Sequence, residues 1–496
     1  MTESILETLD RLQQRSDLPK DAIFDLSVIA TALRHAQHVE TSNGDDIREH
    51  GRRFAELLQA MKVSEIVATA PDKRVNALLG TIIDAASSTA SSPLQGNFLK
   101  QAFIKFLYFA DQQFAEIVRI APDIALPLFA DFTSMLLRQH NSLVLFGKHD
   151  TNSEPEVSPG DRLTEANLTA YFQEKLADAT ASATKLMTLT GGFGKETTLF
   201  SLSSKTLNAD LVLRRDSPID VYKKLDCHTA TREYPLLKAV HSRGFPAPEP
   251  ILLEEKPLII KGPSFTIMRR IPGVAVGDAT GGQGMVSAEL TRTLAQVAAR
   301  LHSTEPLTEL SNIPAFDSAL WKMTASECAR TYIEASYQRY LNTSHLPMPV
   351  LHGLYSWLLA HVPITDEPPA LVHGDIGFHN LLLNEGELSA VLDWEFAHVG
   401  DPAEDIGYIR SLMANQLDWP RFIAEYQGAG GTIPSEERVR FFEIWAQVRN
   451  ATSSVITVDH FKAGRYRNIR YGWLVFRYMP HFIAQAETLI ANFDKY

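Results

Sequence analysis

Acidic and amide side chains stand at the ends of short apolar runs in the stretch LVHGDIGFHNLLLNEGELSAVLDWEFAHVGDPAED, which spans residues 371–405. The apolar runs NLLL and LSAVLD flank the polar turn NEGE, a pattern that predicts a β-hairpin folded about Gly386. Such a hairpin brings Asn380 and Asp393 together at its open end, with Asp375 in the loop that precedes the first strand. Two oxygen ligands beside a third carboxylate suit a hard cation such as Mg²⁺, which shares its coordination sphere with substrate phosphates.

Each of these three polar residues could alone be the capping group of a turn, which is a common role of Asp and Asn. Their joint occurrence at these offsets, on a hairpin whose fold brings them together, favours a functional site over three unrelated caps. Binding of a transition metal is disfavoured, because no thiolates or clustered imidazoles converge on the hairpin.

The type of secondary structure predicted around this hairpin changes along the chain. After a polar segment, a helix is predicted for 164–186, and β-type runs between Thr197 and Arg215 predict a twisted antiparallel sheet. A further strand, SFTIMRRI, covers 264–271, and helical patterns dominate from Ser287 onward. The sequence therefore predicts an α+β fold with a small β-rich lobe followed by a large helical lobe, and the hairpin belongs to the helical lobe.

The first 150 residues form a separate, all-α region in this interpretation. From Asn97, apolar residues recur at helical spacing, and a second helix is predicted for 123–146. No metal-ligand spacing or nucleophile arrangement occurs there, so the region is interpreted as a packing or interaction module. The polar stretch KHDTNSEPEVSPGD marks a boundary. The predicted divisions are a helical N-terminal domain 1–150, a linker 151–163, a small lobe 164–271 and a large lobe 272–496.

Composition and charge narrow the function classes. The 496 residues are 45% hydrophobic and 21% charged, values typical of a globular protein that buries sizeable cores. A net charge of −12 argues against nucleic acid as a partner, since phosphate binding favours basic surfaces. Two cysteines, Cys227 and Cys328, cannot form a disulfide framework. Neither a secretory signal nor an apolar run of the roughly 20 residues that span a bilayer is evident, so a cytoplasmic location without a membrane partner is predicted.

The motifs HGD-x4-N, DWE and GDPxxD, in this order and at these separations, resemble the signature of the aminoglycoside phosphotransferase and choline kinase-like family, whose members are related to protein kinases. The resemblance covers about residues 161–480. The elements VLRR and REY are most similar to the acyl-CoA dehydrogenase-associated phosphotransferases of this family. The resemblance implies a bilobal protein kinase-like fold, ATP and Mg²⁺ as cofactors, and transfer of a phosphoryl group to a hydroxyl.

The same resemblance assigns roles to residues of the hairpin stretch. Asp375 resembles the catalytic base, which orients the acceptor hydroxyl and takes its proton. Asn380 and Asp393 resemble the Mg²⁺ ligands. His373 resembles the histidine that holds the catalytic loop, and Asp405 resembles the acid that supports this loop through backbone hydrogen bonds. The resemblance thus implies a catalytic group of Asp375 and His373 and a metal pair of Asn380 and Asp393.

Four further residues of the stretch are assigned less specific roles. Trp394 and Asp401 are interpreted as structural residues. Glu395 is a candidate neighbour of the metal, and His379 is interpreted as a packing or substrate-side residue rather than a ligand.

A glycine-rich turn, GGFGKETT, lies where this family binds phosphates. Gly191, Gly192, Gly194 and Lys195 are the candidate nucleotide contacts, because the backbone N–H groups of a tight glycine turn can approach phosphate oxygens. The turn is not a Walker A loop, since Lys195 is followed by glutamate and position 189 is leucine. The family usually carries a Ser-Asn pair where this chain has Gly194-Lys195, so a simple hairpin turn remains the alternative.

The strand LVLRR ends in two arginines where a protein kinase has a lysine. Arg214 is predicted to contact the α- and β-phosphates, with Arg215 as the second candidate, and the alternative is that both are solvated charges. Glu233 of TREYPLL resembles the helix glutamate that pairs with this cation. Pro235 follows two residues later, and a helix that began near it would leave Glu233 at the helix mouth. Met268 lies in the strand whose backbone is expected to bind adenine.

The segment after the metal aspartate bears on the acceptor. Only 12 positions separate Asp393 from Asp405, too few for the activation segment with which a protein kinase holds a peptide. The predicted function is an ATP- and Mg²⁺-dependent phosphotransferase that acts on the hydroxyl group of a small molecule. Acceptors in the resembling family include aminoglycosides, choline, sugars and amino alcohols, and in the most similar group hydroxy acids or hydroxyacyl thioesters. Three arginines are candidates for an anionic acceptor or for salt bridges between helices: Arg465, Arg467 and Arg470.

Two questions stay open at this point. The divergent glycine turn, the Pro235 anomaly and the extra N-terminal region also fit a nucleotide-binding pseudokinase whose helical domain is an interaction or regulatory module. Retention of Asp375, Asn380 and Asp393 favours the enzyme. The N-terminal domain is predicted to act either as a lid over the acceptor pocket or as the contact surface of a homodimer.

Overall fold

The structure, a computed structural model, describes the chain in several stretches and divides it into two compact units. The first unit comprises residues 1–154, 336–362 and 447–496, and the second comprises 155–335 and 363–446. The described residues are 52, 56, 73–92, 96–120, 162–189, 195–216, 226–276, 285–303, 316–344, 346, 348–462 and 478–493. Each unit is therefore assembled from segments that are far apart in the sequence.

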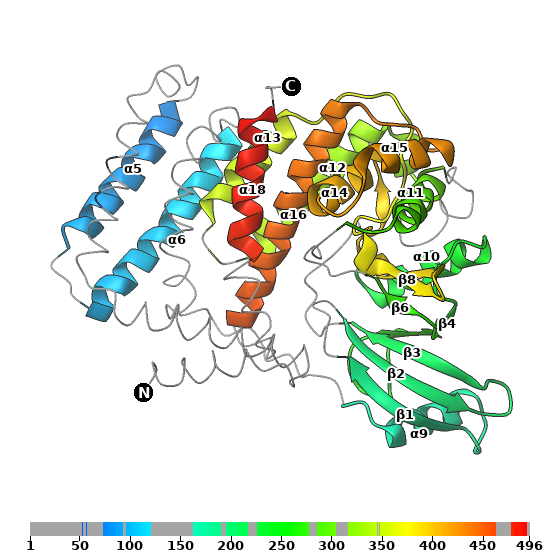
Figure 1. The fold of residues 1–496 in the computed structure, drawn as a ribbon. Coiled ribbons are helices and arrows are strands. Elements are labelled where there is room, and N and C mark those ends of the chain that lie inside the picture. The colour runs from blue at the N-terminus through cyan, green and yellow to red at the C-terminus, as the bar shows by residue number, and fades with distance from the viewer. Residues whose placement is uncertain are drawn as a thin grey trace, which may run out of the picture. The chain divides into compact units, whose positions relative to one another are not determined.

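The second unit contains a small lobe made of a five-stranded antiparallel sheet and two helices (Figure 1). Its elements are α9 Glu165–Lys175, β1 Ser182–Leu189, β2 Glu196–Ser203, β3 Ala209–Arg215, α10 Ala230–Ser242, β4 Pro250–Glu254 and β5 Phe265–Arg269. The strand order is β1-β2-β3-β5-β4. Side chains alternate across β3, so Leu211, Leu213 and Arg215 are buried on one face while Arg214 lies on the other.

The segment predicted as one helix over 164–186 is a helix followed by a strand. Helix α9 ends at Lys175, and β1 begins at Ser182 and pairs with β2. Between them, Asp178 accepts hydrogen bonds from the backbone N–H and the hydroxyl of Thr180, a local turn that competes with a helix. The prediction of a continuous helix is wrong, because turn chemistry and sheet pairing outweigh the helical spacing of apolar residues.

Helix α10 begins well before Pro235. It starts at Ala230 and continues through the proline to Ser242. Leu236 and Leu237, which follow the proline, are buried in the core, and their burial stabilises the helix despite the missing N–H. Glu233 therefore lies within the helix and not at its mouth, and its side chain is fully buried.

The second unit also contains a larger, mainly helical lobe, which confirms the predicted division into a small sheet lobe and a large helical lobe (Figure 1). Its strands form two small sheets, one with the order β6-β8-β9 and one that pairs β10 with β7. The core of this lobe includes Leu294, Trp394 and Ile406. The elements are β6 Val274–Ala275, α11 Ala288–His302, η1 Leu320–Lys322, β7 Ala370–Val372, η2 Phe378–Asn380, β8 Leu381–Asn384, β9 Glu387–Val391, η3 Trp394–Phe396, β10 His398–Gly400, α14 Ala403–Met413 and α15 Trp419–Gly428, with parts of α12 Ala325–Thr343 and α16 Glu436–Lys462.

The predicted hairpin is formed by β8 and β9. Leu381 lies opposite Val391, and the backbone N–H of Leu392 donates to the carbonyl of Asn380 over 2.8 Å. The turn contains Gly386, whose φ of 89° is a backbone conformation that glycine adopts without strain. The predicted register is confirmed, because Asn380 lies directly opposite the residue that precedes Asp393.

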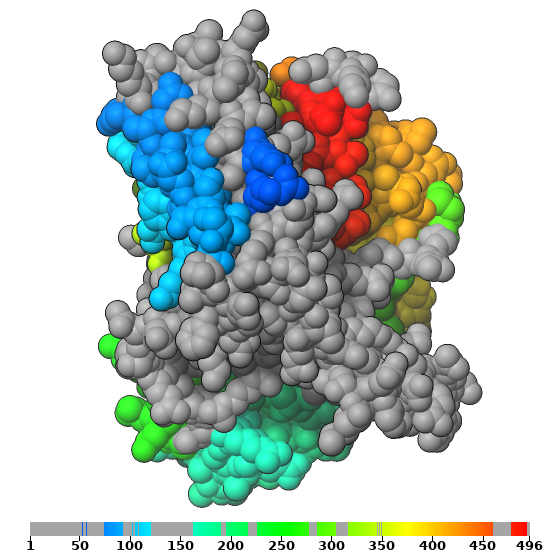
Figure 2. All heavy atoms as spheres, turned by 90° about the vertical axis from the view of Figure 1, so that its left-hand side faces the viewer, coloured from blue at the N-terminus to red at the C-terminus, as the bar shows by residue number. Residues whose placement is uncertain are grey.

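The first unit is helical in its described parts. Its helices are α5 Lys73–Ala90, α6 Gly96–Ile120, α13 Pro349–Ala360 and α18 Met479–Ala491, together with parts of α12 and α16. Helix α6 confirms the helix predicted to begin at Asn97. Asp111 of α6 accepts a hydrogen bond from the backbone N–H of Met348 (2.8 Å) and contacts Nε2 of His352 (3.2 Å). This carboxylate therefore caps α13, whose own N-cap residue supplies no side-chain bond. Helices α5 and α18 contribute to the surface seen in Figure 2.

Within the described ranges, no helix is both long and apolar enough to cross a bilayer. Some sequence predictions fall on residues outside these ranges. Among them are the helix over 123–146, most of the linker 151–163, and the three arginines 465, 467 and 470. An all-α N-terminal domain beyond α5 and α6 stays a prediction.

Candidate active site

The loop between β7 and β8, residues 373–380, is held by a buried carboxylate. Asp405, in the first turn of α14, accepts hydrogen bonds from the backbone N–H groups of His373 (2.9 Å) and Gly374 (2.8 Å). Nε2 of His302 lies 3.1 Å from the same carboxylate. Burial acts to raise the pKa of Asp405, but the hydrogen bond and charge of His302 outweigh burial, and the pKa is lowered. The ionised carboxylate thus supports the loop, as the resemblance implied.

His373 links the loop to the end of the hairpin. Its Nδ1 lies 3.3 Å from the backbone N–H of Asp375, and its Nε2 lies 3.1 Å from the carbonyl oxygen of Leu392. Together these contacts fit a neutral ring that accepts at Nδ1 and donates at Nε2. Burial lowers the pKa of His373, which also favours the neutral form. The side chain of His373 thus connects the loop 373–380 to the end of the hairpin.

Asp375 is surrounded by hydrogen-bond donors. Nδ2 of Asn380 donates to the backbone carbonyl of Asp375 (2.8 Å) and to its Oδ2 (3.1 Å). The hydroxyl of Tyr408 donates to Oδ1, and Nε2 of His379 lies 3.5 Å from the same oxygen. Both carboxylate oxygens are therefore fixed in place, an arrangement that suits a base aimed at one direction of approach.

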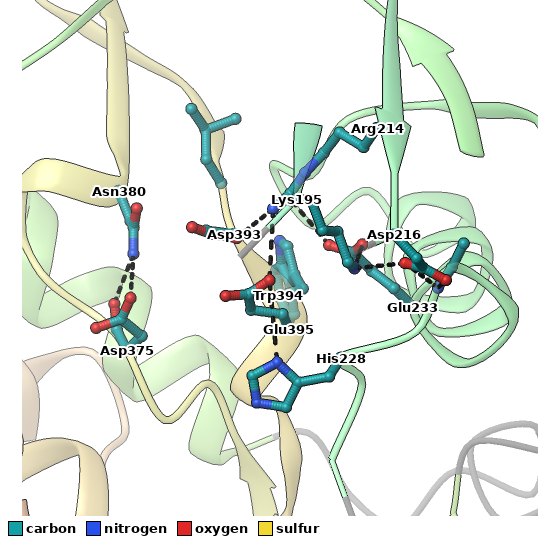
Figure 3. A network of polar contacts seen from close by, with 12 residues as sticks. Lys195, Arg214, Asp216, His228, Glu233, Asp375, Asn380, Asp393, Trp394 and Glu395 are labelled. Carbon is teal, nitrogen blue, oxygen red and sulfur yellow. Dashed lines mark hydrogen bonds and ion pairs between the residues drawn. The ribbon is translucent and has the colours of Figure 1, made fainter. Parts of the chain in front are cut away.

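Asn380 and Asp393 present oxygen atoms of the kind that Mg²⁺ takes. Because Nδ2 of Asn380 is engaged with Asp375, its carbonyl Oδ1 is turned away from that residue. Figure 3 shows the side chain of Asp393 between Asn380 and the cation Arg214. In the described part of the chain, no three His, Cys, Asp or Glu side chains gather as a metal cluster. The two residues fit Mg²⁺ as a site that phosphate oxygens and water would complete.

The backbone at Asp393 is left-handed, with φ 62° and ψ 63°. Few residues with a β-carbon adopt this region, and Asp is among those that tolerate it best. The neighbouring Trp394 is buried, and its indole N–H donates to the carbonyl of Val391 over 2.9 Å. The buried tryptophan anchors the turn and keeps the aspartate in this conformation at the end of the hairpin.

Arg214 joins the small lobe to Asp393, the candidate metal ligand. One guanidinium nitrogen donates to Glu233 (2.9 Å), and the other donates to Asp393 (2.5 Å) and lies 3.8 Å from Glu395 (Figure 3). Burial acts to lower the pKa of Arg214, but the nearby carboxylates outweigh burial and raise it. Arg215 pairs instead with Glu196 on the opposite face of β3, so Arg214 is the arginine that faces the site.

Lys195 forms a second buried contact with Glu233. Its ammonium group donates to the carboxylate oxygen that Arg214 leaves unbound, and lies 4.0 Å from Asp216. Burial opposes the charge of Lys195, yet Glu233 and its acidic neighbours raise the pKa. One glutamate thus holds two cations. Gly191, Gly192 and Gly194, the other candidates in this turn, lie outside the described residues.

Two acidic residues complete the charged network. Glu395 is buried and lies 4.0 Å from Nδ1 of His228; burial and the charge of Asp393 raise its pKa to about 8. Asp216 accepts from the backbone N–H of Ala230 (2.9 Å) and the hydroxyl of Ser264 (2.7 Å). With this raised pKa, Glu395 adds less negative charge beside Asp393 near neutral pH than an exposed glutamate would.

One sequence candidate, Met268, remains to be placed, and three residues of the site were not predicted from the sequence. Met268 lies near the end of β5 with its side chain in the hydrophobic core, so adenine binding by its backbone stays a prediction. Asp216, Tyr408 and His302 were missed. Asp216 directly follows the two arginines and Tyr408 follows Asp405 by three positions, which are weak local signals. His302 has no local signal, because its partner is 103 positions away.

A family profile described as "Phosphotransferase enzyme family" matches residues 187–442, which is more than half of the chain. The matched region includes each candidate catalytic, nucleotide and metal residue named above. The resemblance seen in the motifs is confirmed by this match.

Individual relatives are more distant. Acyl-CoA dehydrogenase family member 11 of Homo sapiens is 27% identical over 322 residues, which is 63% of this chain and 39% of that protein, so the chain spans less than half of that relative's length. A macrolide 2'-phosphotransferase from Brachybacterium faecium is 17% identical with a TM-score of 0.43, over 63% of this chain and 98% of that one. An aminoglycoside phosphotransferase solved with AMP-PNP and hygromycin B is 16% identical with a TM-score of 0.38, over 66% and 98% of the two chains. The classification rests on the family match alone.

Proposed function

Because the chain belongs to the phosphotransferase enzyme family, we propose that it transfers the terminal phosphoryl group of Mg·ATP to the hydroxyl group of a small molecule. The observation that carries this proposal is the convergence of Asp375, Asn380 and Asp393 at the end of one hairpin, with Arg214 bonded to Asp393 from the other lobe. A base, two oxygen ligands and a cation are the parts that phosphoryl transfer requires.

The residues have separate roles in the proposed transfer. Asp375 orients the acceptor hydroxyl and takes its proton as the oxygen bonds to the γ-phosphorus and the bond to the bridging oxygen of ADP breaks. Asn380 and Asp393 would hold Mg²⁺, which when bound supplies neutralisation of phosphate charge. Arg214 and Lys195 bring fixed positive charges from β3 and the start of β2 toward the phosphates.

A small acceptor fits the segment that follows Asp393. The turn Trp394–Phe396 leads directly to strand β10, which pairs with β7, and α14 begins at Ala403. Ordered structure thus fills the short path in which a protein kinase carries its activation segment. No peptide platform is available in this segment, which supports a small molecule as the acceptor.

The proposal is tested by measuring ATP consumption over a panel of hydroxyl compounds that includes hydroxy acids and their CoA esters. With an accepted compound, Asp375→Asn should lower kcat by about 10²–10⁴-fold while ATP binding is retained. Asp210→Asn is the matched control, because Asp210 is exposed on β3 and lies outside the site. If Asp375→Asn transfers phosphate as fast as the wild type, the assignment of the base is wrong.

A pseudokinase remains the second candidate because of one contact. The ion pair between Arg214 and Asp393 engages the carboxylate that a metal would need, and a chain that never exchanged this pair for a metal would bind nucleotide without turnover. Thermal-shift titration of ATP with and without Mg²⁺ separates the two candidates. The enzyme requires greater stabilisation when Mg²⁺ is present, since a ligand that binds the native state raises its stability.

A further inference from the structure

Helix α14 contacts the catalytic loop at two places. Asp405 accepts from the loop backbone at His373 and Gly374, and the hydroxyl of Tyr408 donates to Oδ1 of Asp375. Tyr408 itself is buried. One contact therefore fixes the course of the loop, and the other reaches the carboxylate of the proposed base.

The spacing of Asp405 and Tyr408 along α14 places both contacts on the same side of the helix. Residues 405 and 408 are three positions apart, so their side chains lie on the same face of the helix. Gly407 lies between them, and a β-carbon there would be 2.7 Å from the β-carbon of Phe442 and 2.8 Å from its carbonyl carbon. Only glycine permits so close an approach to α16, and this packing holds the helix, and with it Tyr408, at a set distance from the loop.

The donors on Asp375 leave little rotational freedom to its carboxylate. Tyr408 donates to Oδ1, and Asn380 donates to Oδ2. Each carboxylate oxygen has two lone pairs, so a hydrogen bond to one of them does not prevent the carboxylate from taking the proton of an acceptor hydroxyl. Loss of the Tyr408 donor would leave Oδ1 with the longer contact to Nε2 of His379 (3.5 Å) and allow the carboxylate to turn about its χ2 axis.

The partner of Tyr408 distinguishes it from other buried tyrosines of the second unit. The hydroxyl of Tyr171 is 3.0 Å from Glu254, at the edge of the small lobe, and that of Tyr426 is 2.8 Å from His302. A buried tyrosine needs a polar partner for its hydroxyl, and many partners satisfy this need. The partner of Tyr408, by contrast, is Asp375, the proposed catalytic base.

We propose that Tyr408 is a positioning residue that holds the carboxylate of Asp375 in the orientation in which it receives the acceptor proton. The inference rests on the proposed function. Tyr408 keeps its own proton throughout and acts only through Asp375. Its removal should therefore lower the rate of transfer without weakening the binding of ATP, because the nucleotide contacts come from other elements.

The first test compares Tyr408→Phe with Tyr171→Phe, which removes a hydroxyl from a residue outside the site. The probes are Mg·ATP with water as the acceptor, read as phosphate release, and Mg·ATP with the best alcohol of the panel. Tyr408→Phe should lower kcat by about 10- to 100-fold, the cost of a misplaced catalytic group, with KM for ATP and the melting temperature close to those of Tyr171→Phe. A kcat within twofold of the wild type, or equal losses in kcat and in ATP affinity, overturns the inference.

A rescue variant guards against a folding defect. Replacement of Tyr408 by para-aminophenylalanine keeps the ring and a donor at the same position, and it should restore most of the turnover lost in Tyr408→Phe. If the rescue variant folds as the wild type does and remains as slow as Tyr408→Phe, the donor is irrelevant and the inference fails.

The double variant separates this inference from the proposed function. In an Asp375→Asn background, Tyr408→Phe should have no further effect on residual phosphate release, since its role runs through Asp375. A further tenfold loss there overturns the positioning role. Wild-type activity in Asp375→Asn alone overturns the proposed function, whereas a slow Asp375→Asn beside a fully active Tyr408→Phe overturns only the inference about Tyr408.

Discussion

Two arginines of the second unit are bonded to aspartates in different ways. Arg438 holds Asp401 with two nitrogens, at 3.2 and 2.6 Å, and the side chain of Asp401 is only 2% exposed. Arg214 reaches Asp393 with one nitrogen, and that carboxylate is 37% exposed. The first pair is closed, since both of its side chains are shielded from solvent. The second pair is open, because Asp393 retains a face toward solvent and toward Asn380.

This difference in exposure shows that an arginine–aspartate pair can serve two purposes. In the closed pair, two charges that have left water compensate each other, and loss of the arginine would leave the buried carboxylate of Asp401 without a cation. Arg438 also donates to Glu367 over 2.6 Å. In the open pair, Glu233 also binds Arg214, so the arginine keeps a partner if Asp393 changes its own. The proposed metal site would require the second pair to exchange its arginine for a metal ion.

The largest expected effect comes from breaking the closed pair. Arg438→Gln leaves Asp401 buried without its cation and should lower the free energy of unfolding by about 3–5 kcal/mol. Urea denaturation measures the change. The double variant Arg438→Met, Asp401→Leu removes both charges and should recover much of the loss. A single variant as stable as the wild type would erase the distinction between the two pairs.

Removal of the arginine of the open pair should change two binding affinities in opposite directions. Arg214→Met removes the cation that competes for Asp393, so Mn²⁺ alone should bind about tenfold more tightly, which corresponds to about 1.4 kcal/mol. ATP should bind about tenfold more weakly, because a phosphate contact is lost. Electron paramagnetic resonance of Mn²⁺ and calorimetry with ATP measure the two affinities. Arg215→Met is the control on the other face of β3, and weaker binding of both ligands to Arg214→Met would indicate a merely structural arginine.

Glu395, which lies 3.8 Å from the arginine of the open pair, should also give the stability a dependence on pH. Folding raises the pKa of Glu395 from 4.5 to about 8, so between these values the unfolded chain loses a proton that the folded chain keeps. The free energy of unfolding in EDTA should therefore fall as the pH rises through this window, by at most about 1.4 kcal/mol per pH unit. Glu395→Gln should remove this part of the slope. Parallel pH profiles for the two proteins would show that Glu395 has its ordinary pKa.

The smallest effect is expected at an exposed pair. Arg269 and Glu249 are 2.6 Å apart, but their side chains are 42% and 40% exposed. Arg269→Ala should change the free energy of unfolding by about 0–1 kcal/mol, as for other solvated ion pairs. Thermal melts in low and high salt measure this change. A loss as large as that of Arg438→Gln would mean that burial does not decide the contribution of these pairs.

Sequence reasoning succeeded where the relevant residues are close along the chain. The register of the β8–β9 hairpin follows from its turn, so the position of Asn380 opposite the residue that precedes Asp393 could be predicted from local pattern. The alternation of β3 likewise separates Arg214 from Arg215. Short-range geometry of this kind has few solutions once the turn or strand is recognised.

Sequence reasoning failed where distant elements meet. The contact of Lys195 with Glu233 spans 38 positions, and that of Tyr408 with Asp375 spans 33. Neither spacing has a period that a helix or strand would impose. The cap of α13 by Asp111 bridges 237 positions. These contacts depend on how elements pack, which local propensity does not encode.

The left-handed backbone at Asp393 has a consequence for how this sequence can change over generations. Glutamate would preserve the charge but fits this backbone region poorly, while asparagine or glycine would fit the backbone but lack the charge. Two independent requirements, the left-handed backbone and the negative charge, thus apply to position 393, and aspartate alone meets both. We expect saturation mutagenesis to recover no active substitute at this position. Among related chains, a change here would mark the lineages that have abandoned turnover.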